Sequence, residues 1–126
     1  MKLGSIIPIL RVFDAAKARE FYLDFLGFRA DFEHRFERGL PLYMQVSRDE
    51  CVLHLSEHHG DATPGSALRI ATDGLDALHA ELSAKEFKHA RPGLESQPWG
   101  RDMSVSDPFG NRLIFTDAPG KPKDSQ

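Results

Sequence analysis

Trp99, the only tryptophan in the chain, lies between Pro98 and Gly100 in a segment suited to binding a flat molecule. An indole offers a large, rigid surface for stacking, and the neighbouring glycine gives the backbone freedom to present it. A tryptophan also serves to fill the edge of a hydrophobic core. The segment therefore predicts a ligand-stacking surface or a core residue, and both interpretations stay open.

The polar residues that we expect on the ligand side of the strands are His54, the arginines Arg11, Arg69 and Arg112, and the hydroxyl residues Ser56 and Thr116. His54 suits a general base or a ligand contact, and the alternative is a hydrogen-bonded histidine without chemistry. Arg11 and Arg69 suit the binding of an anion such as a carboxylate. The alternative for both is pairing with acidic side chains, for which Asp102 and Glu33 are candidates.

Other reactive residue types are better explained without chemistry. His58 and His59 stand beside Glu57 and Asp61, but their spacing matches no known metal-binding pattern, so a solvated loop is expected. Cys51, the single cysteine, lies in an apolar run and is expected to be a small buried residue rather than a nucleophile. A lone cysteine forms no internal disulfide and fits a cytoplasmic protein.

The first half of the chain predicts the order β-α-β-β-β. Residues 5–12 form a strand with Pro8 inside it, which favours a sheet edge because proline donates no ladder hydrogen bond. Asp14 caps a helix over residues 15–25, which Gly27 ends. Alternating residues predict strands over 28–36, 42–47 and 51–56. Phe28, Phe32 and Phe36 are expected in the core or a groove, with Phe32 as a second stacking surface.

The second half repeats this order. Strands are predicted over 67–72, 101–106 and 111–116, a helix over 75–85, and a weak strand within 87–95. Asp107-Pro108-Phe109-Gly110 predicts the turn of the last hairpin, because each residue type suits its turn position. Leu10-Arg11-Val12 matches Leu68-Arg69-Ile70 and Met44 to Ser47 matches Met103 to Ser106, which indicates an internal repeat. By this alignment Arg11 and Arg69 are equivalent residues.

Composition limits the classes of function. The chain has 126 residues, enough for one domain with a real core, and a net charge of −3 that calls for neither nucleic acid nor an anionic membrane. The N-terminal segment is too short and too broken by Pro8 for a signal peptide or a membrane span. We expect one domain over residues 1–117, with modules 5–56 and 66–117, a linker 57–65 and a flexible tail 118–126.

Two stretches, IPILRVFDAAKAREFYLDFLGF and QPWGRDMSVSDPFGNRLIF, resemble the glyoxalase/bleomycin-resistance family of the vicinal oxygen chelate superfamily. The resemblance implies an α+β fold like that of glyoxalase, bleomycin-resistance protein and dihydroxybiphenyl dioxygenase, with two βαβββ modules whose curved mixed sheets surround a cavity. It also implies a homodimer that exchanges the first strand at Pro8, and a drug groove at the interface lined by Trp99.

The family's metal positions fall on Ile7, His54, Gly65 and Ile114 of this chain. Isoleucine and glycine offer no side-chain donor, so three of the four positions cannot bind a metal. We therefore expect no metal and no cofactor. The family's isomerase, thiol-transfer and dioxygenase reactions depend on a metal, so the chain is expected not to be an enzyme.

The resulting hypothesis is a metal-free, cytoplasmic homodimer that sequesters a small amphipathic molecule, with antibiotic resistance as the family-implied role. Its expected ligand-binding residues are Trp99, Phe32, His54, Arg11, Arg69 and Arg112. The arginines argue against bleomycin itself, because a cationic drug favours an acidic groove. One alternative is a metal-dependent lyase or dioxygenase that holds its ion through His54, and another is an interaction domain with a vestigial groove.

Overall fold

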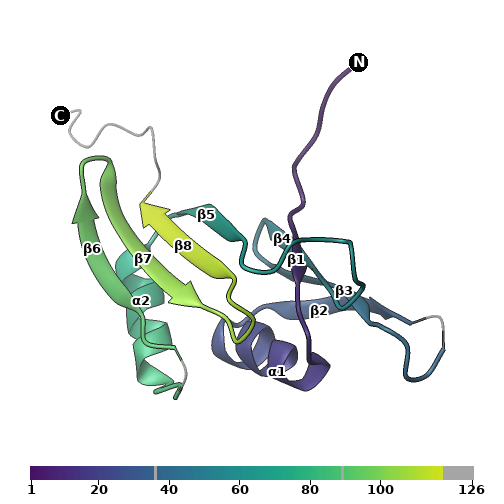
Figure 1. Ribbon diagram of the computed structural model, residues 1–126. Helices are drawn as coiled ribbons and strands as arrows, with labels where there is room; N and C mark the ends of the chain where they lie inside the picture. The colour runs from purple at the N-terminus through teal and green to yellow at the C-terminus, as the bar shows by residue number, and fades with distance from the viewer. Residues whose placement is uncertain (36, 89, 118–126) are drawn as a thin grey trace. The chain divides into compact units, whose positions relative to one another are not determined.

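The computed structural model describes residues 1–35, 37–88 and 90–117. The chain divides into two compact units, Met1–Ser66 and Ala67–Gln126, and each contains one four-stranded mixed sheet and a helical segment (Figure 1). The predicted α+β fold with two βαβββ modules is therefore confirmed. Phe36 and the expected tail 118–126 lie outside the described residues. Within the described ranges, no helix is both long and apolar enough to cross a membrane.

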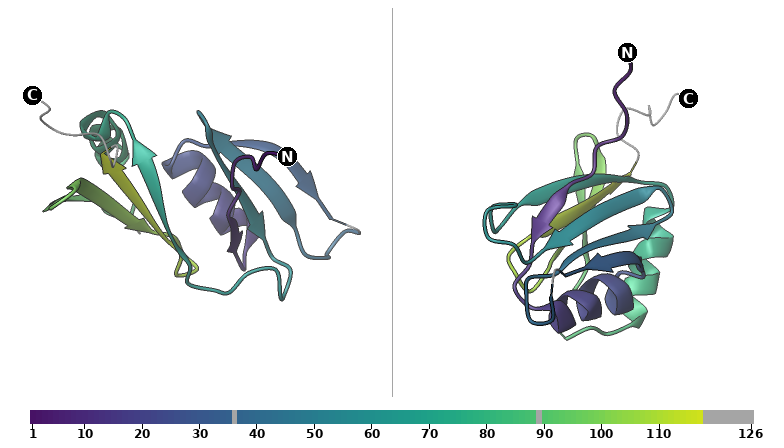
Figure 2. Two further views of the ribbon diagram at one scale, coloured as in Figure 1. Left: turned by 90° about the horizontal axis from the view of Figure 1, so that it is seen from above. Right: turned by 90° about the vertical axis from the view of Figure 1, so that its right-hand side faces the viewer.

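The first module is built on a sheet with the strand order β1-β4-β3-β2. β1 (Ile9–Arg11) runs parallel to β4 (Cys51–Ser56). β3 (Tyr43–Arg48) pairs antiparallel with both β4 and β2 (Arg29–His34). One face of this sheet is covered by the helical segment that follows β1 (Figure 2).

β1 is shorter than the predicted strand over residues 5–12. It lies at the sheet edge, as Pro8 predicted, and the Pro8 carbonyl accepts a hydrogen bond of 2.9 Å from the His54 amide. Because proline lacks an N–H, the ladder cannot continue regularly toward the N-terminus. Residues 1–8 consequently carry no helix or strand, and nearly all of them are exposed.

The helix predicted over residues 15–25 is only partly α-helical. Asp14 caps it as expected, because its carboxylate accepts from the Lys17 amide at 2.9 Å. α1 (Ala15–Arg19) then widens into a π-helical segment, η1 (Glu20–Phe25). The wider turn buries Phe21, Tyr22 and Phe25 together, each at most 1% exposed. The apolar spacing predicted this buried stripe but did not distinguish the two helix types.

β2 departs from the predicted alternation. Its register against β3 shifts between Ala30 and Phe32, so Asp31 is the extra residue of a β-bulge. All six residues of β2 are exposed, and Phe32 is 47% exposed, so Phe32 is not a core residue. Phe28, directly before the strand, is buried as expected.

The second module has the strand order β5-β8-β7-β6. β5 (Ala67–Thr72) is parallel to β8 (Arg112–Asp117), and β7 (Gly100–Ser106) is antiparallel to β8 and β6 (Gly93–Gln97). α2 (Leu75–Ala84) begins after Gly74 and packs on one face of this sheet (Figure 1). β6 lies further along the chain than the weak strand predicted within 87–95, because it pairs with β7 across a turn of only two residues.

The turn between β7 and β8 forms as predicted. Asp107 accepts from the amides of Phe109 and Asn111 at 2.8 Å each, and from the Asn111 side chain at 2.8 Å. Gly110 adopts a φ of 89°, which favours glycine. This hydrogen-bonded turn fixes how β8 returns along β7.

The buried face of each sheet consists mainly of the residues that alternation placed there. Leu68 and Ile70 on β5 are only half-buried, unlike the rest of the set. The buried members are Leu10, Val12, Leu53, Leu55, Leu113 and Phe115.

The register of the strands corrects the predicted repeat. Ile9 pairs with His54, and Arg69 pairs with Ile114, so equivalent strand pairs are offset by 60 residues. Arg69 is therefore the equivalent of Ile9, not of Arg11. The match of Leu10-Arg11-Val12 with Leu68-Arg69-Ile70 is therefore wrong, because leucine-arginine-aliphatic sequences recur on both edge strands. The match of Met44 with Met103 agrees with the register, since their partners Leu55 and Phe115 are equivalent.

Candidate functional site

Trp99 lies in the two-residue turn between β6 and β7, where Gln97 pairs with Gly100. Its side chain is not a core residue, because Trp99 is 50% exposed. The indole Nε1 donates a hydrogen bond of 3.1 Å to Oδ1 of Asp102. The Arg69 guanidinium carbon lies 5.1 Å from the ring centroid, over the ring. Two contacts thus hold an exposed indole in a defined orientation.

Asp102 is the centre of this cluster. Its Oδ1 also accepts from Arg69 Nη1 at 2.9 Å and from Thr116 Oγ1 at 2.8 Å, while Arg69 Nη1 donates to Thr116 Oγ1 at 2.7 Å. Burial acts to raise the pKa of Asp102, but the hydrogen bonds from Trp99, Thr116 and Arg69 outweigh it, and the pKa is lowered. Asp102 is therefore a carboxylate at neutral pH, and it compensates the charge of Arg69.

The structure gives each predicted arginine a different environment. Arg69 pairs with Asp102, which was the alternative to anion binding. Arg11 donates to the Glu57 carbonyl at 3.1 Å and covers the Phe13 ring at 4.7 Å, and Glu33 pairs with Arg19 instead. Arg112 is exposed on β8.

His54 lies in a row of polar side chains across the first sheet. Its Nδ1 lies 2.6 Å from the Tyr43 hydroxyl, and its Nε2 lies 2.9 Å from Gln45 Oε1. Gln45 Nε2 in turn donates to Asp31 Oδ2 at 3.0 Å. The edge of the exposed Phe32 ring meets the His54 ring at a centroid distance of 5.9 Å. His54 is thus the hydrogen-bonded histidine of the alternative interpretation, placed beside an exposed aromatic ring.

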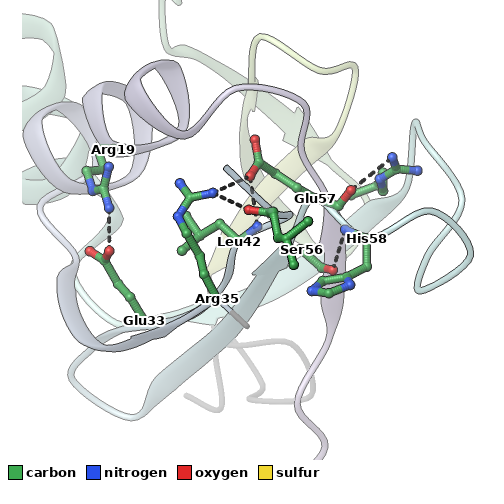
Figure 3. A network of polar contacts seen from close by, with 9 residues as sticks. Arg19, Glu33, Arg35, Leu42, Ser56, Glu57 and His58 are labelled. Carbon is green, nitrogen blue, oxygen red and sulfur yellow. Dashed lines mark hydrogen bonds and ion pairs between the residues drawn. The ribbon is translucent and has the colours of Figure 1, made fainter. Parts of the chain in front are cut away.

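Polar contacts hold the segment after β4 against the first module (Figure 3). Ser56 Oγ donates to Asp61 at 2.6 Å and accepts from the His58 amide at 3.0 Å. Glu57 accepts from the Leu42 amide at 2.9 Å and pairs with Arg35 at 3.5 Å. The His58 ring lies 6.4 Å from the Tyr43 ring. His58 and His59 therefore lie in a loop as expected, with His58 half-buried against Tyr43 and His59 exposed.

The positions assigned to the family's metal carry few donors. By the observed register the equivalent of Ile7 is Ala67 rather than Gly65, and neither offers a ligand atom. Both ring nitrogens of His54 already have hydrogen-bond partners. Among residues 1–35, 37–88 and 90–117, no group of three or more His, Cys, Asp or Glu side chains is placed to hold a metal. Cys51 is half-buried, and burial raises its pKa, which keeps it a thiol.

Sequence reasoning missed Tyr43 and Gln45 as site residues, and it placed Thr116 on the ligand side without assigning it a role. Strand alternation carried the signal, because Tyr43 and Gln45 share a face of β3, and Gln45 pairs directly with His54. The register makes Tyr43 and Asp102 equivalent as well, since each faces the corresponding hydroxyl residue, Ser56 or Thr116. The same sheet position thus carries a polar residue of the described cluster in each module.

Solved structures of similar fold include two antibiotic-related proteins that share just over a quarter of their residues with this chain. TnmS3, an antibiotic binding protein from Streptomyces sp. CB03234, is 27% identical with a TM-score of 0.76, over 94% of this chain and 98% of that chain. The bleomycin-binding protein from Streptomyces verticillus, solved with copper(II)-bleomycin, is 28% identical with a TM-score of 0.67, over 94% and 98%.

A bleomycin resistance determinant encoded on the transposon Tn5 shares the fold, at 22% identity and a TM-score of 0.71 over 92% of this chain and 98% of that chain. No similar protein was found among the curated proteins. The family model described as glyoxalase superfamily protein matches residues 1–121. Because this match covers nearly the whole chain, the protein belongs to the glyoxalase superfamily.

Proposed function

We propose that the protein binds and sequesters a small amphipathic molecule of the antibiotic class, with Trp99 as its stacking surface. The observation that carries this proposal is the half-exposed indole, held by Asp102 and covered on one side by Arg69. A fixed aromatic plate loses little conformational entropy when a flat ligand stacks on it. The opposite ring face of Trp99 is the proposed contact surface.

The similar structures support a binding role. TnmS3 is described as an antibiotic binding protein, and the Streptomyces verticillus protein was solved with copper(II)-bleomycin. Both match this chain over nearly its whole length. A shared fold does not fix the ligand, so the chemistry of Trp99 and its neighbours carries the proposal for this chain.

The charge of the cluster is compatible with a cationic ligand. Arg69 argued against bleomycin as a free cation, but Asp102 compensates its charge at 2.9 Å. The Trp99 cluster therefore carries no net positive charge from this pair, and bleomycin is a suitable first probe. Arg112 stays exposed and is proposed to contact polar groups of the ligand.

We further propose a cytoplasmic homodimer in which residues 1–8 exchange between subunits at Pro8. Leu3 and Ile6 are 85% and 90% exposed in the single chain. A partner subunit that received this segment would bury both side chains, which is favourable by about 1.5–3 kcal/mol for each large aliphatic residue. The groove of the proposed ligand site would lie at that interface.

A thermal-shift titration tests the binding role with metal-free bleomycin and copper(II)-bleomycin as probes. A ligand that binds only the native state at one hundred times its Kd stabilises it by about 2.7 kcal/mol, which raises Tm by several degrees. Trp99→Ala is expected to abolish the shift and Leu40→Ala, at an exposed residue outside the cluster, to preserve it. An unchanged Tm shift in Trp99→Ala would exclude the proposed contact. The Trp99→Phe variant keeps an aromatic ring at this position, and its Tm without ligand checks that substitution here leaves the fold intact.

A further inference from the structure

Four polar side chains of the first module form one continuous hydrogen-bonded row, from Asp31 on β2 through Gln45 on β3 and His54 on β4 back to Tyr43 on β3. The bulge at Asp31 brings its carboxylate onto Gln45, out of the regular alternation of β2. Arg29 donates to the other oxygen of Asp31 at 3.1 Å. An aspartate is ionised at neutral pH, and the pKa of Asp31 is lowered further, chiefly by the hydrogen bond from Gln45.

Because Asp31 at one end of this row is ionised, the donor and the acceptor of each hydrogen bond along the row can be assigned. A carboxylate only accepts, so the amide nitrogen of Gln45 must face Asp31 and its oxygen must face His54. The amide oxygen also only accepts, so Nε2 of His54 carries a proton. In a neutral imidazole Nδ1 is then the acceptor, and the Tyr43 hydroxyl donates its proton to Nδ1 at 2.6 Å.

Tyr43 therefore offers a ligand an acceptor rather than a donor. Its proton is committed to His54, and the lone pairs of its oxygen remain available. Tyr43 is half-buried, and its pKa is raised by burial and secondly by the negative charge of Asp61, so it stays a neutral phenol. The negative potential of Asp61 at this oxygen favours a positively charged donor over a neutral one.

An exposed aromatic ring lies next to His54, the residue that receives the Tyr43 proton. Phe32 is 47% exposed and meets the His54 ring edge to face, and the Tyr43 ring meets His54 at 5.1 Å. Phe32 and Tyr43 thus both contact the same histidine ring, so we expect a ligand whose ammonium reaches the Tyr43 oxygen to direct an attached ring or alkyl group toward Phe32. The three rings and the acceptor come from β2, β3 and β4 of one sheet.

We propose that Tyr43, His54 and Phe32 form a recognition site for an apolar group that carries an ammonium donor, with Gln45 and Asp31 as positioning residues. Gln45 and Asp31 act by fixing the His54 tautomer. This site rests on the first module alone and needs no contribution from Trp99. It goes beyond the proposed function by adding a second, independent site for a cationic, hydrogen-bond-donating ligand, and a failed bleomycin titration would leave it standing.

The tautomer is tested by long-range proton–nitrogen NMR of the histidine-labelled protein at pH 8, where histidine side chains are ordinarily neutral. The expected spectrum shows His54 protonated at Nε2. Gln45→Leu removes the acceptor and is expected to shift the population toward the Nδ1-protonated form. Gln97→Leu is the matched control, because the Gln97 side chain donates to Glu95 at 3.4 Å in the other module. An Nδ1-protonated His54 in the unaltered protein would overturn the proposal.

Recognition is tested with phenethylammonium and, as a probe of opposite charge and similar shape, phenylacetate. Phenethylammonium is expected to shift the His54 and Tyr43 resonances in a saturable manner, and phenylacetate to leave them unmoved. Tyr43→Phe keeps the ring and should weaken binding about tenfold, as the loss of one hydrogen bond does. The Trp99→Phe variant should bind phenethylammonium with unchanged affinity. Equal responses to both probes, no response to either, or full affinity in Tyr43→Phe would each refute the site.

Discussion

Arg69 Nη1 lies 2.9 Å from Oδ1 of Asp102, the oxygen that also accepts the indole proton of Trp99 at 3.1 Å. One carboxylate oxygen therefore joins the edge strand β5 to the turn that presents Trp99. This relationship makes the orientation of the proposed stacking surface depend on Asp102, and it neutralises an arginine that a cationic ligand would otherwise meet. The first two predictions follow from it.

Asp102→Asn is expected to destabilise the protein by about 1–3 kcal/mol, because a buried network loses its charge while its donors stay in place. Urea unfolding measures this difference. In the same variant the fluorescence change of Trp99 on ligand binding should extend over a wider range of ligand concentration, because a weaker hydrogen bond holds the indole. Asp73→Asn, at an exposed position before α2, is the control and should unfold like the unaltered protein. Equal stability of both variants would contradict the central role of Asp102.

Stability should fall at acid pH through Asp102. Its pKa is lower in the folded protein than in the unfolded chain, so its contribution is complete above about pH 4 and is lost as the pH falls through the folded value. Tm measured from pH 6 to pH 2 should decline more steeply in the unaltered protein than in Asp102→Asn. Parallel curves would mean that other carboxylates, such as Glu33 beside Arg19, dominate the acid response.

Asp107→Ala should cost about 2–3 kcal/mol, because the turn loses a carboxylate that accepts from two backbone amides and one side chain. Chemical unfolding followed by circular dichroism measures the loss. Asp73→Ala serves as the comparison at an exposed position. A difference below about 0.5 kcal/mol, the ordinary scale of surface substitutions, would show that the hairpin closes without this turn.

The oligomeric state should depend on the N-terminal segment. Deletion of residues 2–7 is expected to convert a homodimer into a monomer, because the exposed apolar side chains Leu3 and Ile6 are the proposed exchanged contacts. Sedimentation velocity of the deleted and complete chains measures the change. Leu40→Ser, which removes an exposed apolar residue elsewhere, should leave the dimer intact. If the complete chain is a monomer, or if the dimer survives the deletion, the proposed strand exchange is wrong.

Local chemistry predicted much of the fold from sequence. Asp14 caps α1, Gly27 ends the helical segment and Asp107 builds its turn because each acts through neighbouring backbone groups. The π-helical segment η1 was not predictable, since apolar spacing fits either helix type. The Asp31 bulge escaped prediction because alternation assumes a regular ladder.

The candidate site was harder to predict because register decides which residues meet. Trp99, His54 and Arg69 were identified by residue type, but the hydrogen bonds of Tyr43 and Gln45 to His54 depend on the pairing of β3 with β4. Short matching triplets made Arg11 and Arg69 equivalent, whereas the paired strands assign Arg69 to Ile9. Residue types thus identified the candidate site residues, and only the strand register showed which side chains contact one another.

The fluorescence of Trp99, the only indole in the chain, tests the central claim most directly. Its emission should change saturably during titration with metal-free bleomycin, alongside a rise in Tm, while divalent metals alone should change neither. A rise in Tm without any change in Trp99 emission would mean that the ligand binds elsewhere. A rise in Tm with metal alone would contradict the account and favour a metal-dependent enzyme of the same superfamily.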